Sequence, residues 1–205
     1  VVLVPQCEGS VKGQVSGKDL ALVEQRAQQL QKERGAFRAD QFKLESSYRA
    51  HLLHTAQEMW EQTDGQIDCF VDIVGSGGTF EGCAEGLKAH RSDIRCYVVE
   101  PETAAVYAGH SVQNEGRHKI QGCGYAMDLV SVKKELIDGC IQVSDEDALQ
   151  TARDLARLEG TFVGISSGAN VHAAIQLLRG KEKGKKIILT LNDSGLKYLS
   201  TDLFE

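Results

Sequence analysis

The sequence predicts an α/β fold in which a parallel sheet lies between two layers of helices. Short apolar runs typical of buried strands recur along the 205 residues, segments with helical spacing separate them, and the two kinds of segment alternate. Strand, helix and strand in that order make a right-handed parallel crossover the default. Because ligands of such sheets bind beyond the carboxyl ends of the strands, the loops that follow the strands are the candidate sites.

The amino-terminal third is predicted to contain one strand and two helices. Val1 to Val4 form an apolar run that we expect to be a buried strand. Apolar residues at helical spacing predict a helix from Lys18 to Arg34 and a second from Ser46 to Gln62, and Asp64 and Gly65 close the second. Neither apolar stripe needs a ligand to explain it.

The remaining two thirds continue the alternation. The expected strands cover residues 68–74, 94–100, 140–143 and 186–191, and the expected helices cover residues 79–90, 145–159 and 167–178. Ser144 and the three acidic residues after it predict the start of the helix at 145, because a hydroxyl cap and negative charge both stabilise a helix N-terminus.

Composition excludes several classes of function. The net charge of −6 argues against general affinity for nucleic acid or anionic membranes, and we interpret the lysine cluster at 181–186 as a solvated turn. No apolar run approaches the roughly 18 residues of a membrane span. Six cysteines without a CxxC pair fit a reducing cytoplasm. No metal site is expected, because the histidines show no ligand grouping beyond His51 and His54, which would share a helix face.

The loop Gly75-Ser76-Gly77-Gly78-Thr79 carries the clearest chemical signal. It follows the apolar run 69–74 and opens a predicted helix, so its backbone N–H groups and the helix N-terminus can hold a phosphate. A dinucleotide loop would need a third glycine where Phe80 stands, and a Walker loop would need Gly-Lys-Ser or Gly-Lys-Thr. A tight connection without a ligand stays open on the loop alone.

Further segments resemble the cysteine synthase and cystathionine β-synthase family, the fold type II pyridoxal-phosphate enzymes. They occur in the family's order and at about its spacing: Gln41-Phe42, the glycine loop, His118 to Gly124, Gly164 to Ala169, and Ser194-Gly195 with Tyr198 to Thr201. The resemblance covers nearly the whole chain. It implies that Gly75 to Thr79 hold the phosphate of pyridoxal 5′-phosphate (PLP) and that Ser194 hydrogen-bonds the pyridine nitrogen.

The same resemblance implies a substrate side of the site and a reaction. Gln41 would lie near the carboxylate of a small amino-acid substrate, and Gly122 would line the entrance. A serine at the pyridine nitrogen does not enforce a protonated ring, so it favours expulsion of a β-leaving group over transamination. Attack by a thiol or sulfide would then give cysteine or a relative.

One part of the family pattern is missing. Family members anchor the cofactor through a lysine in a Ser-Val-Lys-Asp-Arg type segment. Lys12 in Gly9 to Gln14 mimics it but lies 63 residues before Gly75, too close for the family's order. We therefore assign no catalytic residue and expect a carboxyl-terminal part of a larger enzyme that is inactive alone. Residues 1–34 would end a small domain, and residues 35–205 would form the large PLP-binding domain without its first strands.

Other departures leave the substrate open. Lys43 to Ser47 replace an Asn-Pro-Ala-Asn type stretch, and Asn192 replaces a proline. The candidates are an O-acylated serine, serine, homocysteine, cysteine and sulfite, and the full-length enzyme is expected to be a homodimer. Two other interpretations remain: a non-catalytic paralogue that binds PLP or phosphate, and a doubly wound module that binds nucleotides.

Overall fold

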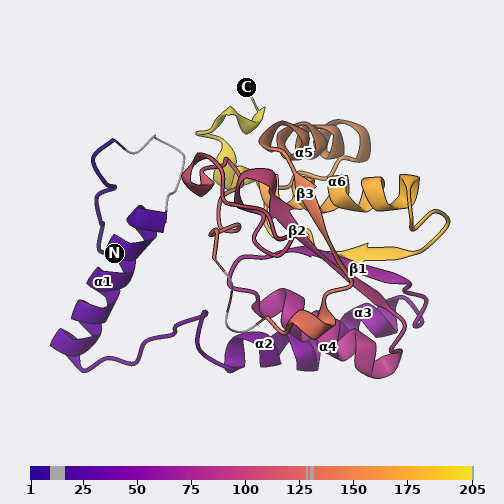
Figure 1. Ribbon diagram of the computed structural model, residues 1–205, viewed down its shortest axis with the longest axis horizontal. Helices are drawn as coiled ribbons and strands as arrows, with labels where there is room; N and C mark the ends of the chain where they lie inside the picture. The colour runs from indigo at the N-terminus through magenta and orange to yellow at the C-terminus, as the bar shows by residue number, and fades with distance from the viewer. Residues whose placement is uncertain (10–16, 128, 130–131, 205) are drawn as a thin grey trace.

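A parallel sheet lies at the centre of the protein (Figure 1). The computed structural model describes residues 1–9, 17–127, 129 and 132–204, and within these the sheet has four strands in the order β3-β2-β1-β4. The strands are β1 (Cys69–Ile73), β2 (Arg95–Pro101), β3 (Gly139–Val143) and β4 (Ile187–Leu189). In the register, Val71 lies opposite Tyr97 on one side and Leu189 on the other. All three strand pairs are parallel, which confirms the predicted parallel sheet.

Helices cover both faces of this sheet, which confirms the predicted three-layer architecture (Figure 1). The helices on one face are α5 (Asp145–Glu159) and α6 (Ile165–Arg179); those on the other are α2 (Ser46–Ala50), α3 (Ala56–Gln62) and α4 (Gly78–His90). The predicted start of α5 is also confirmed, because the Ser144 hydroxyl accepts a hydrogen bond from the Asp147 amide at 3.1 Å.

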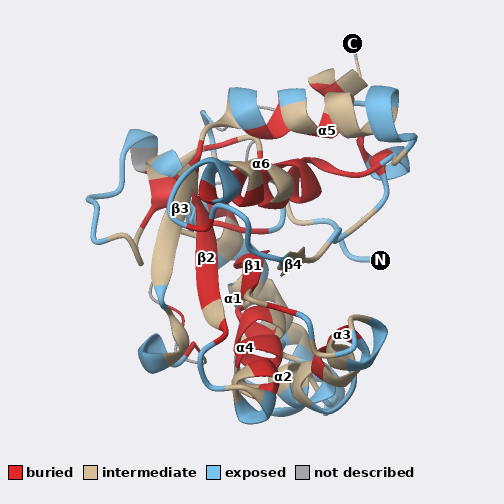
Figure 2. Cartoon of the chain, turned by 90° about the vertical axis from the view of Figure 1, so that its right-hand side faces the viewer, coloured by how far each residue is buried: buried red, intermediate tan, exposed pale blue. Residues whose placement is uncertain are grey.

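Two cores result, one on each face of the sheet. Side chains alternate along β1, so Val71 and Ile73 pack beneath α6, whereas Phe70 and Val74 pack beneath α4. Figure 2 shows β2, α4 and much of α6 as buried, whereas the edge strand β3 is mostly intermediate. Because both faces are covered, both sets of positions must be apolar, which explains why the strands read as continuous apolar runs in the sequence.

The segment predicted as one helix from Ser46 to Gln62 contains a widened turn. Between α2 and α3 the backbone forms a π-helix, η1 (His51–Thr55), and the helix continues through it. The periodicity of apolar residues could not show the π turn, because it rotates the side chains of the turns that follow it without ending the helix.

Glycines on one face of α4 allow this helix to pack at backbone distance. A Cβ atom placed on Gly78, Gly82 or Gly86 would lie 2.3–2.5 Å from an atom of α2 or α3. These positions are four residues apart, so they share one face of α4. The close packing brings the π turn next to the glycine loop at the start of α4.

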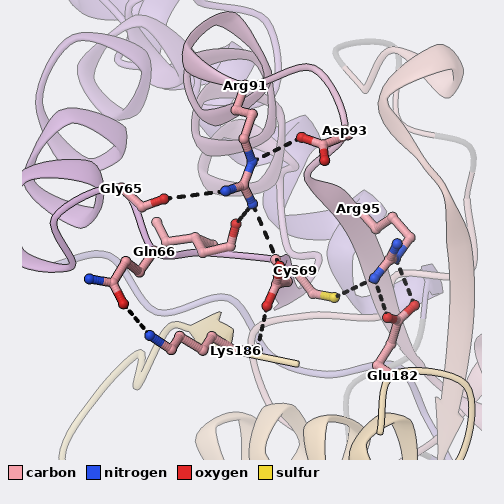
Figure 3. A network of polar contacts seen from close by, with 10 residues as sticks. Gly65, Gln66, Cys69, Arg91, Asp93, Arg95, Glu182 and Lys186 are labelled. Carbon is pink, nitrogen blue, oxygen red and sulfur yellow. Dashed lines mark hydrogen bonds and ion pairs between the residues drawn. The ribbon is translucent and has the colours of Figure 1, made fainter. Parts of the chain in front are cut away.

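A network of charged side chains closes the opposite, amino-terminal end of the sheet (Figure 3). The buried carboxylate of Glu182 accepts hydrogen bonds from Arg95, one of them at 2.8 Å, and from the Tyr97 hydroxyl. Arg95 also donates to the Cys69 sulfur at 3.7 Å. The turn of lysines predicted to be solvated is thus fixed to β2 by the acidic residue within it.

Replacing Glu182 with glutamine is expected to lower the free energy of unfolding by about 2 kcal/mol at pH 7, because Arg95 loses its charged acceptor but is itself partly exposed. Burial alone would raise the pKa of Glu182, but hydrogen bonds from Tyr97 and Arg95 outweigh it and leave the pKa lowered. The carboxylate therefore stabilises the fold above its unfolded pKa of about 4.3, and that contribution is lost as pH falls through its folded pKa.

Urea denaturation of the Glu182→Gln variant at pH 7 and pH 3 checks this expectation, with Glu58→Gln as the exposed control on α3. The deficit should shrink at pH 3. An equal deficit at both pH values would show that the charge of Glu182 does not contribute.

The strand predicted for Val1 to Val4 is wrong. These residues form no strand, and Val1, Val2 and Leu3 are exposed. An apolar run becomes a strand only where a sheet edge accepts it, and this segment instead leads to a hydrogen bond from the Cys7 amide to Asp19 at 2.7 Å.

The predicted helix near Lys18 is confirmed as α1 (Gly17–Arg34), which stands apart from the sheet in Figure 1. Among its residues only Asp19 is buried. Lys12 lies outside the described residues, and the division into domains at residue 34 stays a prediction.

Candidate cofactor site

A cavity of about 500 Å³ opens beyond the carboxyl end of β1. Its walls come from the glycine loop, the loop at 121–123, the start of α6 and the segment 192–198. The structure brings six of the predicted site residues to this cavity: Gln41, Gly75, Ser76, Gly77, Thr79 and Gly122. This is the position at which a doubly covered parallel sheet places its ligands.

Two predicted residues lie outside the lining of this cavity. Gly78 lines a neighbouring cavity of about 300 Å³, to which Gln41 also contributes. Ser194 is exposed, and its hydroxyl accepts a hydrogen bond from the Leu196 amide at 3.3 Å. Its role at the pyridine nitrogen therefore stays a prediction.

The conformation of the glycine loop explains its composition. Gly77 has φ +90°, a region that strains other residues, and caps the N-terminus of α4. A Cβ atom on Gly75 would lie 2.7 Å from the carbonyl oxygen of Gly122, so the two loops approach each other at backbone distance. Any larger residue at position 75 would push these walls of the cavity apart.

The donors at this end of the cavity suit a phosphate ester. The first amides of α4 have no acceptor in their own helix, and no side chain caps them at Gly77. The hydroxyl-bearing residues Ser76 and Thr79 stand in the same lining, and the helix N-terminus adds a partial positive charge. The residues present therefore fit a phosphate-bearing cofactor.

A buried carboxyl group lies at the floor of the cavity. Asp72 is 2% exposed and precedes the glycine loop by three residues. Its Oδ1 atom accepts hydrogen bonds from the Thr190 hydroxyl and from Asn170 Nδ2, the latter at 3.4 Å. Burial raises the pKa of Asp72 to about 7, although these hydrogen bonds lower it in part. Near neutral pH the floor of the cavity thus gains or loses a charge.

The segment 192–198 forms a second wall. The Tyr198 hydroxyl donates to Asp193 Oδ2 at 3.0 Å, and burial followed by this contact raises the pKa of Tyr198. Within the described chain, the other carboxylate oxygen of Asp193 is buried without a hydrogen-bond partner. Lys197 Nζ lies 3.6 Å from Asp193 Oδ2, so a lysine borders the cavity on this side.

Cys123 lines the cavity without offering a nucleophile. Its sulfur is buried and lies 3.3 Å from the Ile120 carbonyl oxygen, to which the thiol donates. Burial, and then the carboxylates nearby, raise the pKa of the thiol, which stays protonated at neutral pH. It acts here as a small apolar wall residue.

Asp72, Asp193, Lys197 and Tyr198 were not identified as site residues from the sequence. A signal existed for Asp72, because an acidic residue inside an otherwise apolar buried run needs a reason. The other three could be recognised only from the structure, which shows where the segment 192–198 lies relative to the glycine loop. Among the residues that the structure describes, no cluster of three metal-ligating side chains occurs, and no helix is long and apolar enough to cross a membrane.

The chain is similar to known proteins in sequence and in structure. A family model described as "Pyridoxal-phosphate dependent enzyme" matches residues 4–193. A cysteine synthase of Staphylococcus aureus (strain Mu50 / ATCC 700699) is 36% identical over 180 residues, which cover 87% of this chain and 57% of the relative. The chain thus spans a little over half the length of such relatives.

Solved structures give the same picture. The O-acetyl serine sulfhydrylase isoform 3 of Entamoeba histolytica superposes with a TM-score of 0.84 at 34% identity, over 91% of this chain and 56% of that one. The O-acetylserine dependent cystathionine beta-synthase of Helicobacter pylori gives a TM-score of 0.81 at 28% identity, over 92% of this chain and 59% of that one.

Proposed function

Since this chain belongs to the pyridoxal-phosphate dependent enzyme family, we propose that it forms the greater part of a PLP site in a cysteine synthase-like enzyme. The reaction is replacement or elimination of a β-substituent on a serine- or cysteine-derived amino acid. The observation that carries the proposal is the cavity beyond β1, because the glycine loop, Gln41 and Gly122 meet there. The relatives named for O-acetylserine chemistry support an O-acylated serine as substrate.

The chain's own residues would bind and orient the reactants. Backbone amides of Gly75 to Thr79 and the Thr79 hydroxyl would hold the phosphate. Gln41, which lines the same cavity, would hold the substrate carboxylate, and Gly122 would keep the entrance open. When bound, PLP supplies the electron sink that allows a β-substituent to leave.

The ring of the cofactor would extend toward the segment 192–198. The resemblance assigns Ser194 to its nitrogen, and for this contact the Ser194 hydroxyl would leave the Leu196 amide. The hydrogen bond from the buried Tyr198 to the partly buried Asp193 would keep that segment in place. We further propose that the parent enzyme acts in the cytoplasm as a homodimer on a small amino acid.

A second candidate is a non-catalytic paralogue that keeps the phosphate site. One observation favours it: the lysine that borders the cavity, Lys197, belongs to the segment 192–198 and not to a segment that resembles the family's anchor. Such a protein would bind PLP reversibly and form no lysine-linked adduct.

Titration of the chain with PLP, followed by absorbance and equilibrium dialysis, tests the proposal. We expect saturable binding that inorganic phosphate competes and adenine nucleotides do not. Binding without a lysine-dependent visible band would agree with a chain that lacks the anchor, whereas a band lost in a Lys12 or Lys197 variant would assign the anchor to that residue. Binding of ATP in preference to PLP would contradict the proposal and favour a nucleotide module.

A further inference from the structure

His51 connects the π turn to the glycine loop. Its Nε2 atom lies 3.2 Å from the Thr79 hydroxyl oxygen, and its Nδ1 atom lies 3.0 Å from the Thr55 hydroxyl oxygen. The ring is half-buried between these two threonines. Thr79 lines the cofactor cavity and His51 does not, so His51 stands directly behind the wall that would contact a phosphate.

The local fold places the ring there. The π-helix η1 begins at His51, and π turns re-aim side chains that a regular helix would direct elsewhere. Gly82 allows the approach, because a Cβ atom at that position would lie 2.8 Å from the Cβ atom of His51. Two unusual features, a π turn and a glycine contact, therefore converge on one imidazole.

The hydrogen-bond roles follow from what Thr79 must do. A hydroxyl has one proton to donate, and an anionic phosphate oxygen can only accept. If Thr79 donates to phosphate, its oxygen can accept from His51 only when the proton is on Nε2. We propose that His51 is a positioning residue that donates from Nε2 to Thr79 and so directs the Thr79 hydroxyl toward the phosphate of the cofactor.

This arrangement couples phosphate binding to the protonation of His51. Burial lowers the pKa of the imidazole, and no charged side chain on the described elements packed against it contributes to the shift. A phosphate dianion held beyond Thr79 would add a negative charge close to the ring, and this charge favours the imidazolium form. The inference rests on the proposed function, because it assumes that the glycine loop binds PLP.

Three variants separate positioning from structure. His51→Gln keeps a donor near the place of Nε2 but cannot titrate, His51→Leu removes the donor, and His54→Leu is the control, since His54 is exposed on the same turn. Affinity for PLP is measured by equilibrium dialysis, and circular dichroism checks the fold. We expect His51→Leu to bind roughly tenfold more weakly, and both His51→Gln and His54→Leu to stay within about threefold of the wild type.

A spectroscopic readout reports the proton itself. Imidazole ¹⁵N shifts, assigned with the His51→Gln variant, should place the proton on Nε2 when PLP is bound, with the pKa of His51 raised relative to the free protein. PLP binding with an unchanged His51 pKa and full affinity in His51→Leu would overturn the inference and leave the proposed function intact. Absence of PLP binding to the wild type would overturn both.

Discussion

A Gly77→Asp variant is expected to bind PLP at least a hundredfold more weakly than the wild type. Gly77 has φ +90°, so an aspartate there strains the loop. Its carboxylate would also lie in the glycine loop, close to the place proposed for the phosphate. A carboxylate and a phosphate charge 4 Å apart repel by about 4 kcal/mol at an effective dielectric constant of 20. Repulsion and strain act together, which makes this the largest effect on binding that we expect.

A matched control isolates the contribution of the site. Gly160 also has positive φ, +66°, caps the end of α5 and has open space around its Cβ direction. Gly160→Asp therefore adds similar strain and the same charge away from the cavity, and PLP affinity should be unchanged. If a folded Gly77→Asp variant bound PLP as tightly as the wild type and this control, measured by dialysis, the glycine loop would not be the phosphate site.

An Asp72→Asn variant is expected to be more stable than the wild type at pH 8, by about 2–4 kcal/mol. The pKa of Asp72 is about 7 in the folded protein, against 3.8 for an aspartate outside it. This difference of about three pKa units corresponds to about 4 kcal/mol of lost folding free energy once the group is ionised. Between these pH values the folded state holds a proton that the unfolded state has lost, so stability falls as pH rises from about 4 to about 7. Asparagine keeps the acceptor for Thr190 and Asn170 and does not ionise.

Urea denaturation from pH 4 to pH 8 measures this difference. The variant should show little gain at pH 4 and the full gain at pH 8, and Asp93→Asn, which changes an exposed aspartate, should run parallel to the wild type. A gain that does not grow with pH would show that Asp72 is not buried as an acid in the folded protein.

Much of the fold could be predicted because short stretches of sequence specify its strands and helix starts. Continuous apolar runs such as 69–74 occur where a strand is covered on both faces, and the cap at Ser144 specifies a helix start by itself. Val1 to Val4 carry the same kind of apolar run but pair with none of the four described strands. A strand depends on its neighbours, and no property of four residues can supply them.

The candidate site was predictable only in part. The glycine loop could be found because a phosphate cradle needs small residues in sequence order, and Gln41 and Gly122 came with the resemblance. Asp72 and His51 act through contacts with residues 118 and 28 positions away, at Thr190 and Thr79. Such contacts depend on how α4 packs against the π turn and how β4 pairs with β1, which periodicity does not specify.

The most direct test of the account is a map of backbone amide shifts as PLP is added to the ¹⁵N-labelled chain. We expect saturable shifts at Gly75 to Thr79 and no change around Glu182, at the opposite end of the sheet. Saturable binding with shifts confined to other parts of the chain, or no binding at all, would contradict it.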